Sequence, residues 1–168
     1  MLLGNRFFLN RSEFICILCT LKSYQMPHLI QFLIPAYKRS DGVVVAALSV
    51  AEQVVLNAYE DVVRITIVDD ASPGFNRDKL IKSLGNKAEF IDVDSNATNK
   101  GMSRNILDMV ASSNAEFCTI LTDDDWLVEG KLVELVDYLV SLRGKNEIGG
   151  LFTPRHSYLE SGELYGVV

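Results

Sequence analysis

From Leu29 onward, short runs of apolar residues alternate with longer stretches in which apolar residues recur at helical spacing. A buried parallel strand reads as a short continuous apolar run, and the helix that crosses back over the sheet reads as an amphipathic segment. At 168 residues the chain can bury one ordinary core and is too short for two. The sequence therefore predicts one α/β domain built from βαβ units around a parallel sheet.

Turn and capping residues divide this pattern into individual elements. We expect strands at 30–34, 64–68, 89–93 and 117–121, with Pro35 ending the first, then an apolar run at 148–152 and a hairpin-like tail at 158–168. We expect helices at about 41–55, 77–84, 102–112 and 132–139. Ser40 or Asp41 is predicted to cap the first helix and Asn76 the second, which Gly85 ends. The predicted core faces are Val44, Ala47, Leu48, Ala51 and Val55 in the first helix and Ile106, Met109 and Val110 in the third.

Two acidic clusters follow predicted strands, at the sheet edge where open α/β folds form their ligand crevice. Asp69 and Asp70 come directly after the second strand, and Asp123, Asp124 and Asp125 follow the fourth. Three consecutive carboxylates repel one another unless they are solvated or bind a cation, and oxygen ligands suit Mg²⁺, Mn²⁺ or Ca²⁺. The alternatives are a helix cap for the triplet and a closed turn for the pair, which precedes a Pro-Gly step.

The charge of the chain limits its partners. A formal net charge of −6 and a pI near 4.9 argue against nucleic acid, whose binding needs a basic face to replace condensed counterions. Arg104 is a candidate partner for a carboxylate or a phosphate, although it also suits a solvated helix face. His28 and His156 have no nearby Ser or Cys that would indicate a nucleophile, so we expect surface or packing roles for them.

Residues 1–25 stand apart from this pattern. Their apolar run at 14–21 is too short to span a bilayer, which takes about 20 apolar residues, and no small-residue cleavage site follows it. We leave 1–25 as an unassigned extension and expect the domain to occupy 26–168. Cys16, Cys19 and Cys118 do not complete a paired zinc site. We expect them to be reduced in a cytoplasmic protein, with the inner face of the membrane as an alternative location.

Four motifs stand in order along the chain, and together they are more specific than any one alone. They are Phe32-Leu33-Ile34-Pro35-Ala36-Tyr37-Lys38-Arg39, Ile67-Val68-Asp69-Asp70-Ala71-Ser72, Asn99-Lys100-Gly101-Met102-Ser103-Arg104-Asn105 and Leu121-Thr122-Asp123-Asp124-Asp125-Trp126. In order and spacing they resemble the family 2 glycosyltransferases, well over about 29–131 and loosely over 134–168. The resemblance implies the GT-A fold, a Rossmann-like three-layer sandwich with a mostly parallel sheet that binds a nucleotide-diphospho-sugar.

The resemblance also implies a donor site. It places Pro35, Ala36 and Tyr37 beside the nucleotide base, Asp70 on the imide edge of the base, and Arg104 near the base or the diphosphate. The donor it implies is a UDP- or dTDP-sugar. The acceptor it implies is a saccharide or a lipid-linked saccharide, as in polysaccharide biosynthesis.

The Asp triplet corresponds in this resemblance to the family's Asp-x-Asp element. The first place of that element is Thr122 here, which departs from the family pattern. Asp123 is then expected toward the ribose and Asp124 on Mg²⁺ or Mn²⁺, and a shift of the register by one makes Asp125 a second candidate ligand. A divalent ion that bridges a diphosphate stabilises the charge that builds on the leaving group.

The family's acceptor pocket and catalytic base lie further along the chain, commonly in a Glu-Asp motif. Glu160 and Glu163 lie near the end of this sequence, and neither stands in that motif, so we assign no base. We therefore expect the chain to stop before the acceptor part and to show no appreciable sugar transfer. A strand at 165–168 left at an open edge would favour self-association.

Three functions remain to be compared. The leading one is inverting transfer of a sugar from a nucleotide-diphospho-sugar to an acceptor hydroxyl with a divalent metal. An inactive donor-binding module that lacks the base is the alternative. A receiver-type signalling domain is a remote third, because a receiver carries its acidic pair after the first strand, where Pro35-Ala36-Tyr37 stands in this chain.

Overall fold

The computed structural model describes residues 27–143, 156–158 and 164–167. Strands and helices alternate in the order β1 Ile30–Ala36, α2 Ser40–Leu56, β2 Val63–Asp69, α3 Arg77–Leu84, a 3₁₀ helix Gly85–Phe90, β3 Ile91–Ser95, α4 Met102–Ser112, β4 Phe117–Ile120 and α5 Lys131–Leu142. β5 His156–Tyr158 and β6 Leu164–Val167 form a separate antiparallel pair, so the hairpin prediction is confirmed. The expected extension 1–25 and the apolar run 148–152 lie outside the described residues.

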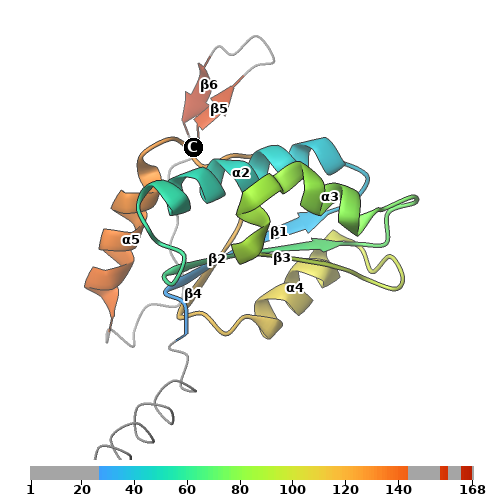
Figure 1. The fold of residues 1–168 in the computed structure, drawn as a ribbon, viewed down its shortest axis with the longest axis horizontal. Helices are drawn as coiled ribbons and strands as arrows, with labels where there is room; N and C mark the ends of the chain where they lie inside the picture. Colours follow the sequence, from blue (N-terminus) through green and yellow to red (C-terminus); the bar gives the residue numbers. More distant parts are fainter. Residues whose placement is uncertain (1–26, 144–155, 159–163, 168) are drawn as a thin grey trace, which may run out of the picture.

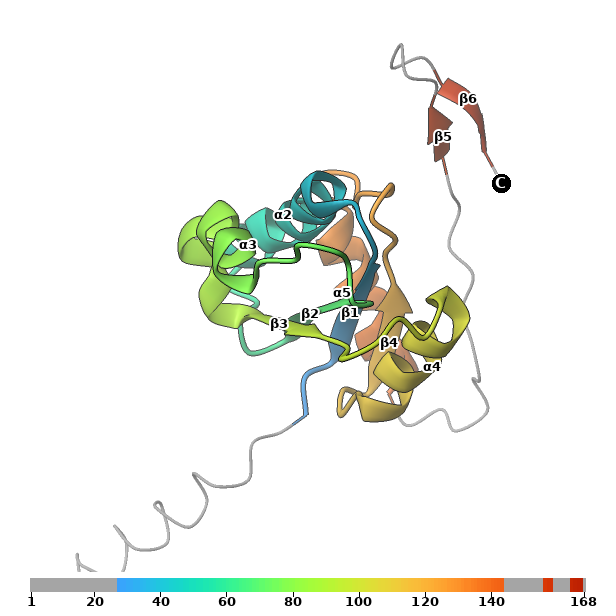
Figure 2. The same cartoon turned by 90° about the vertical axis from the view of Figure 1, so that its right-hand side faces the viewer.

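The four strands β1 to β4 form one parallel sheet with the order β3-β2-β1-β4. Helices α2 and α3 cover one face of the sheet and α4 covers the other, which makes three layers (Figures 1 and 2). In β1 nearly every side chain is buried, whereas in β2 buried apolar residues alternate with half-buried ones. The predicted α/β fold with a mostly parallel sheet is confirmed. No helix of the described residues is long and apolar enough to cross a membrane.

Helix α2 buries most of the predicted face. Ala47 and Ala51 are buried, and Val44 and Leu48 are half-buried against the core. The prediction was wrong for Val55, which is 47% exposed, and it missed Val43, Ala46, Val50 and Val54, because residues 43–48 are all apolar and their periodicity does not select a face. The predicted caps were also wrong: Arg39 occupies the N-cap position without a side-chain cap, and Ser40 and Asp41 lie in the first turn.

Other boundaries followed local chemistry more closely. Asn76 caps α3, as predicted, by accepting a hydrogen bond from the Lys79 backbone N–H at 2.8 Å, and Gly85 ends the helix with a positive φ. β3 begins two residues later than expected, since the 3₁₀ helix occupies the positions before Ile91. In α4 the prediction for Val110 was wrong, because this residue is 38% exposed and Asn105 is buried instead.

Pro35 does not end β1 as predicted but lies within it, paired in register with Val68 of β2. The neighbouring Leu33 carbonyl accepts from the Leu121 N–H on the β4 side, while the Ala36 carbonyl accepts from the Asp70 N–H on the β2 side. Backbone groups alternate in direction along a strand, so Pro35 faces the β4 side, where pairing has already ended at Leu33. The missing N–H of proline therefore removes no ladder hydrogen bond.

Candidate functional site

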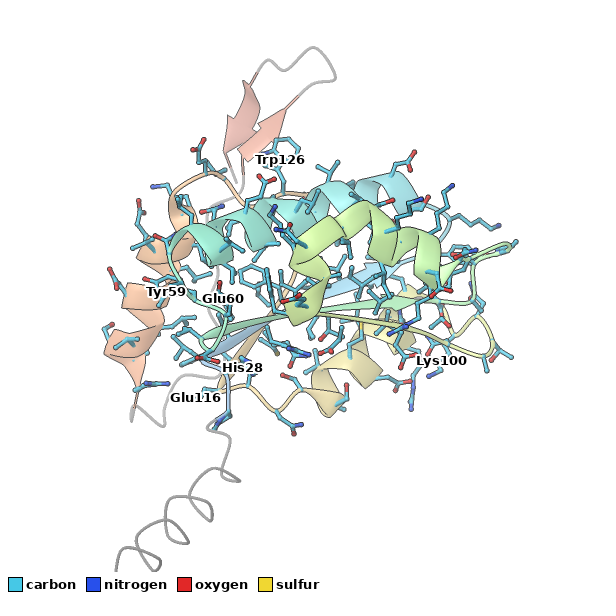
Figure 3. All side chains as sticks on the ribbon, viewed as in Figure 1. His28, Tyr59, Glu60, Lys100, Glu116 and Trp126 are labelled. Atoms are coloured by element: carbon cyan, nitrogen blue, oxygen red, sulfur yellow. The ribbon has the colours of Figure 1, made fainter. Side chains whose placement is uncertain are left out.

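A pocket of about 490 Å³ lies at the carboxyl ends of the parallel strands. This is the size of an ordinary small-molecule site and the place where open α/β sheets bind ligands. Figure 3 shows Lys100 at this end of the molecule, and His28 and Glu116 at the opposite end of the sheet. The lining residues are Pro35, Ala36, Tyr37, Arg39, Asp70, Asn99, Gly101, Met102, Asn105, Thr122, Asp123 and Asp124.

The adjacent carboxylates of Asp69 and Asp70 have different contacts and line different pockets. Asp69 accepts hydrogen bonds from the Ser72 N–H, at 2.7 Å, and from the Ser72 hydroxyl, so it closes the turn after β2. Asp69 lines a second, smaller pocket of about 190 Å³, whereas Asp70 lines the large one. The turn alternative therefore describes Asp69, and Asp70 is the carboxylate placed where a ligand could meet it.

The Asp70 carboxylate holds the loop between β3 and α4. It accepts from the backbone N–H groups of Lys100, at 2.9 and 3.1 Å, and Gly101, at 2.8 Å, and from the Asn96 side chain at 2.8 Å. Asp70 is 2% exposed; burial raises its pKa, but these hydrogen bonds outweigh burial and hold the pKa below its ordinary value. A carboxylate has about four acceptor sites, and these three donors make four contacts with it, two to each oxygen, because the Lys100 N–H is shared between both oxygens.

Asn105 extends this network into the sheet. Its side-chain Nδ2 donates to the Val68 carbonyl at 3.1 Å, and its Oδ1 accepts from the Asn96 side chain at 2.9 Å. Asn105 is 2% exposed and lines the pocket. Asn105 is not among the predicted site residues, although a polar amide among the apolar positions of a helix is a signal that could have indicated it.

Three of the residues predicted to lie beside the nucleotide base, Pro35, Ala36 and Tyr37, line the pocket together. Tyr37 is 41% exposed, and the Lys38 ammonium lies 4.8 Å from the centre of its ring. Arg104 is not among the lining residues. It lies on the exposed side of α4, where its Nε is 2.8 Å from Asp108 Oδ1.

The Asp triplet lies in the loop that follows β4. The Thr122 hydroxyl is 2.7 Å from Asp124 Oδ1 and 2.6 Å from Asp125 Oδ2, so one side chain gathers both carboxylates. Asp123 and Asp124 line the pocket, and Asp125 does not. Burial raises the pKa of Asp123; the Arg39 charge opposes that rise, and the Asp124 charge adds to it.

Arg39, at the N-cap of α2, brings a positive charge to this loop. Its Nη1 is 3.5 Å from Asp123 Oδ1 and 3.6 Å from Asp124 Oδ2. The Arg39 side chain is 60% exposed. The two carboxylates therefore face one common cation, and Arg39 is a site residue that sequence analysis quoted in a motif without assigning it a role.

Helix α2 contacts the loop at 121–130, which carries the Asp triplet and is called the acidic loop below, through three of its residues. A Cβ added to Gly42 would meet the Asp123 carbonyl oxygen inside van der Waals contact, so this position in the first turn needs glycine. Ser49 Oγ accepts from the Leu127 N–H at 2.9 Å. The buried Gln53 side chain donates to the Val128 carbonyl at 3.2 Å and accepts from the Leu132 N–H at 3.1 Å. Residues 42, 49 and 53 share one face of the helix.

The residues that face Arg39 fit a divalent cation bound together with a ligand. Within the described ranges, no group of three or more His, Cys, Asp or Glu side chains converges on a point that could hold a metal alone. Mg²⁺, however, is commonly bound by one or two carboxylates together with substrate phosphates and water. Asp123 and Asp124 supply that donor set, and the Arg39 guanidinium marks where a positive charge lies between them.

Comparisons with known proteins agree with this geometry. The family model "Glycosyl transferase family 2" matches residues 32–157. S. aureus TarS 1–349 is similar in structure with a TM-score of 0.59 and 17% identity, over 80% of this chain and 40% of that one. The same protein in complex with UDP gives a TM-score of 0.57 and 17% identity, over 82% and 43%.

A mannosyltransferase from Pyrobaculum calidifontis, solved with GDP-Man and Mn²⁺, is a weaker match, with a TM-score of 0.48 and 14% identity over 70% of this chain and 33% of that one. No curated protein sequence matches the chain. The chain spans 20 to 43% of the length of the TarS structures that it resembles.

The parallel sheet, with a ligand pocket at its carboxyl edge and an acidic loop beside that pocket, is that of a GT-A nucleotide-sugar-binding fold. The family match covers well over half of the chain, and the chain belongs to glycosyl transferase family 2. The resemblance drawn from the four sequence motifs is thereby confirmed.

Proposed function

We propose that this chain binds a nucleotide-diphospho-sugar in the 490 Å³ pocket and acts in the transfer of the sugar to an acceptor hydroxyl, with inversion at the anomeric carbon. The observation that carries the proposal is the pairing of two carboxylate positions at one pocket. Asp70 follows β2 and donates its N–H to the Ala36 carbonyl, the Asp123–Asp124 pair follows β4 on the other side of β1, and all three carboxylates line the pocket. The family membership and the UDP complex of TarS support a nucleotide-sugar as the ligand.

At the base end, Tyr37 offers an exposed aromatic surface, and Asp70 offers an acceptor for an imide N–H. Both Asp70 oxygens already accept two contacts from the loop, so an imide N–H would share an oxygen with a loop donor or replace the second contact of the Lys100 N–H. A uracil or thymine base has this edge, and UDP- or dTDP-sugars are the donors that we propose. The acceptor that we propose is a saccharide or a lipid-linked saccharide.

At the diphosphate end, Asp124 would hold Mg²⁺ or Mn²⁺ and Asp123 would lie toward the ribose, with Asp125 as the alternative ligand. The bound metal would supply charge stabilisation to the departing diphosphate. The Thr122 hydroxyl holds the Asp124 side chain, and the contacts with α2 hold the backbone of this loop. Arg104 would need to leave Asp108 to reach a donor, so its proposed role at the base or diphosphate is the one least supported by the geometry.

The test begins with ligand binding to the full chain. UDP with Mn²⁺ is expected to raise the melting temperature, because a ligand that binds only the folded state stabilises it by mass action. Asp124→Ala should abolish the metal-dependent part of UDP binding, and Asp70→Ala should weaken binding with or without metal. Asp137→Ala, on the exposed side of α5, is the matched control. Absence of any thermal shift would refute the donor site, and equal metal dependence of both variants would refute the roles.

Transfer is tested separately from binding. Release of nucleoside diphosphate is measured from UDP- and dTDP-sugars, with and without saccharide or lipid-linked acceptors. Acceptor-dependent release supports the transferase, whereas UDP binding without release supports the donor-binding module. We assign no catalytic base, since Glu160 and Glu163 lie outside the described residues. A domain over 26–168, a cytoplasmic location with the inner face of the membrane as the alternative, and self-association through the chain end stay proposals.

A further inference from the structure

The charge of the pocket poses a problem for an anionic ligand. Among the described residues that line it, Asp70, Asp123 and Asp124 are acidic, and Arg39 alone is basic. The nearby Lys38 ammonium lies over the Tyr37 ring, at the base end. A diphosphate that enters beside Asp123 and Asp124 therefore meets two negative charges. Among the described residues that line the pocket, the Arg39 guanidinium is the one cation near them.

The backbone of Arg39 is fixed while its side chain is not. The preceding Lys38 has a φ of 63° and donates its N–H to Ser72 Oγ at 2.8 Å, and Ser72 is in turn held by Asp69. The Arg39 carbonyl accepts from the Val43 N–H at 3.1 Å at the start of α2. The Arg39 side chain, which is 60% exposed, therefore extends from a well-held backbone toward Asp123 and Asp124.

The contacts of the guanidinium with the carboxylates are long. Charge-assisted hydrogen bonds between nitrogen and oxygen are usually about 2.7–2.9 Å, whereas Arg39 Nη1 lies 3.5 and 3.6 Å from its two carboxylate partners. The Arg39 and Asp124 side chains are 60 and 62% exposed, and an exposed pair at such a distance contributes little and can exchange for a better partner; the Asp123 side chain is 15% exposed, and its contact with Arg39 is equally long. Arg39 thus balances the charge of the two carboxylates without forming a short hydrogen bond to either of them.

We propose that Arg39 and the divalent cation exchange places at Asp123 and Asp124. Without ligand, the guanidinium balances the two carboxylates. When a divalent cation binds there with a nucleoside diphosphate, Arg39 turns from the carboxylates to the diphosphate oxygens, for which its planar fork of donors is suited. The same side chain therefore opposes binding of the metal alone and favours binding of the metal with the nucleotide. This inference rests on the proposed donor site.

The experiment compares three titrations of the full chain: Mn²⁺ alone, followed by the electron paramagnetic resonance signal of free Mn²⁺; UDP alone; and UDP in saturating Mn²⁺, by calorimetry. Arg39→Ala should bind Mn²⁺ alone about threefold more tightly, since a weak competing ion pair is removed. The same variant should bind UDP in Mn²⁺ about tenfold more weakly, since a charge-assisted hydrogen bond is lost. Arg39→Lys, which keeps the charge, should restore the wild-type Mn²⁺ affinity and part of the UDP affinity.

Arg143→Ala is the matched control, because this arginine pairs with Glu116 away from the pocket and should change neither titration. Arg39→Gln repeats the comparison if the alanine variant folds poorly. The opposite signs of the two effects distinguish exchange from a structural role, which would weaken both kinds of binding. Unchanged or weaker Mn²⁺ binding by Arg39→Ala, or unchanged UDP binding, overturns the exchange. Failure of the wild-type chain to bind UDP in Mn²⁺ overturns the proposed function instead.

Discussion

Replacing Asp70 by asparagine tests whether one carboxylate holds the loop that borders the pocket. Oδ1 accepts from Asn96 and Lys100, and Oδ2 from Lys100 and Gly101, at distances of 2.8 to 3.1 Å. Asparagine keeps an acceptor on one side only and turns an NH₂ group toward donors on the other. A hydrogen bond to a charged group contributes about 1.5–3 kcal/mol, and a buried unpaired donor costs about 1–3 kcal/mol. We expect Asp70→Asn to lower the free energy of unfolding by about 3 kcal/mol at pH 7.

The stability difference between wild type and Asp70→Asn should depend on pH. The folded pKa of Asp70 lies below its unfolded value, so its stabilisation is present above the unfolded pKa, about 3.9, and is lost as pH falls through the folded pKa. The difference in stability between wild type and Asp70→Asn, from urea unfolding followed by circular dichroism, should therefore be full at pH 7 and should shrink toward pH 3. Asp137→Asn on exposed α5 should stay within about 0.5 kcal/mol of wild type. A loss below about 1 kcal/mol at pH 7, or a difference that is the same at pH 3, would refute the reasoning.

Three further positions are tested, two in α2 beside the acidic loop and one at the N-cap of α3. Gly42→Ala should weaken metal-dependent UDP binding severalfold, because its Cβ displaces the Asp123 carbonyl; calorimetry measures this, and unchanged affinity would contradict the contact. Gln53→Leu should lower the free energy of unfolding by about 2–3 kcal/mol, since it leaves backbone groups of the acidic loop without a partner; urea unfolding that matches wild type would count against it. Asn76→Ala should lower the free energy of unfolding by about 1 kcal/mol through loss of the α3 cap, whereas Asn76→Ser should keep most of the wild-type stability in thermal melts. Equal melting temperatures of the two variants would argue against capping.

What the sequence predicted well was local. Asn76 and Gly85 mark the two ends of α3, because a side-chain cap and a glycine with positive φ act within one turn of the chain. The acidic residues were expected at the sheet edge because they directly follow strands, and Asp70, Asp123 and Asp124 do meet at one pocket there.

What the sequence did not predict depends on distant partners. Gln53 contacts a loop about 75 residues further along the chain, and Arg39 lies 84 residues before Asp123. No local pattern specifies such pairs, although a glutamine in an otherwise apolar helix and a glycine in a first turn are both departures that indicate a tertiary role. The placement of Asp125 outside the pocket lining likewise depends on the loop conformation that Thr122 and α2 impose.

The attachment of the acidic loop to α2 divides the pocket into two independently supported halves. One half, with Asp123, depends on the α2 residues Gly42, Ser49 and Gln53, on one face of the sheet. The other half depends on Asp70 and on α4, which lies on the opposite face (Figure 2). Substitutions in different halves share no partner, so their effects on stability should be nearly additive, while their effects on a ligand that spans both halves should not. Only a ligand that reaches both halves would therefore couple them energetically. Any effect of metal binding on the affinity for the nucleotide base would then arise in the ligand complex and would be absent from the ligand-free protein.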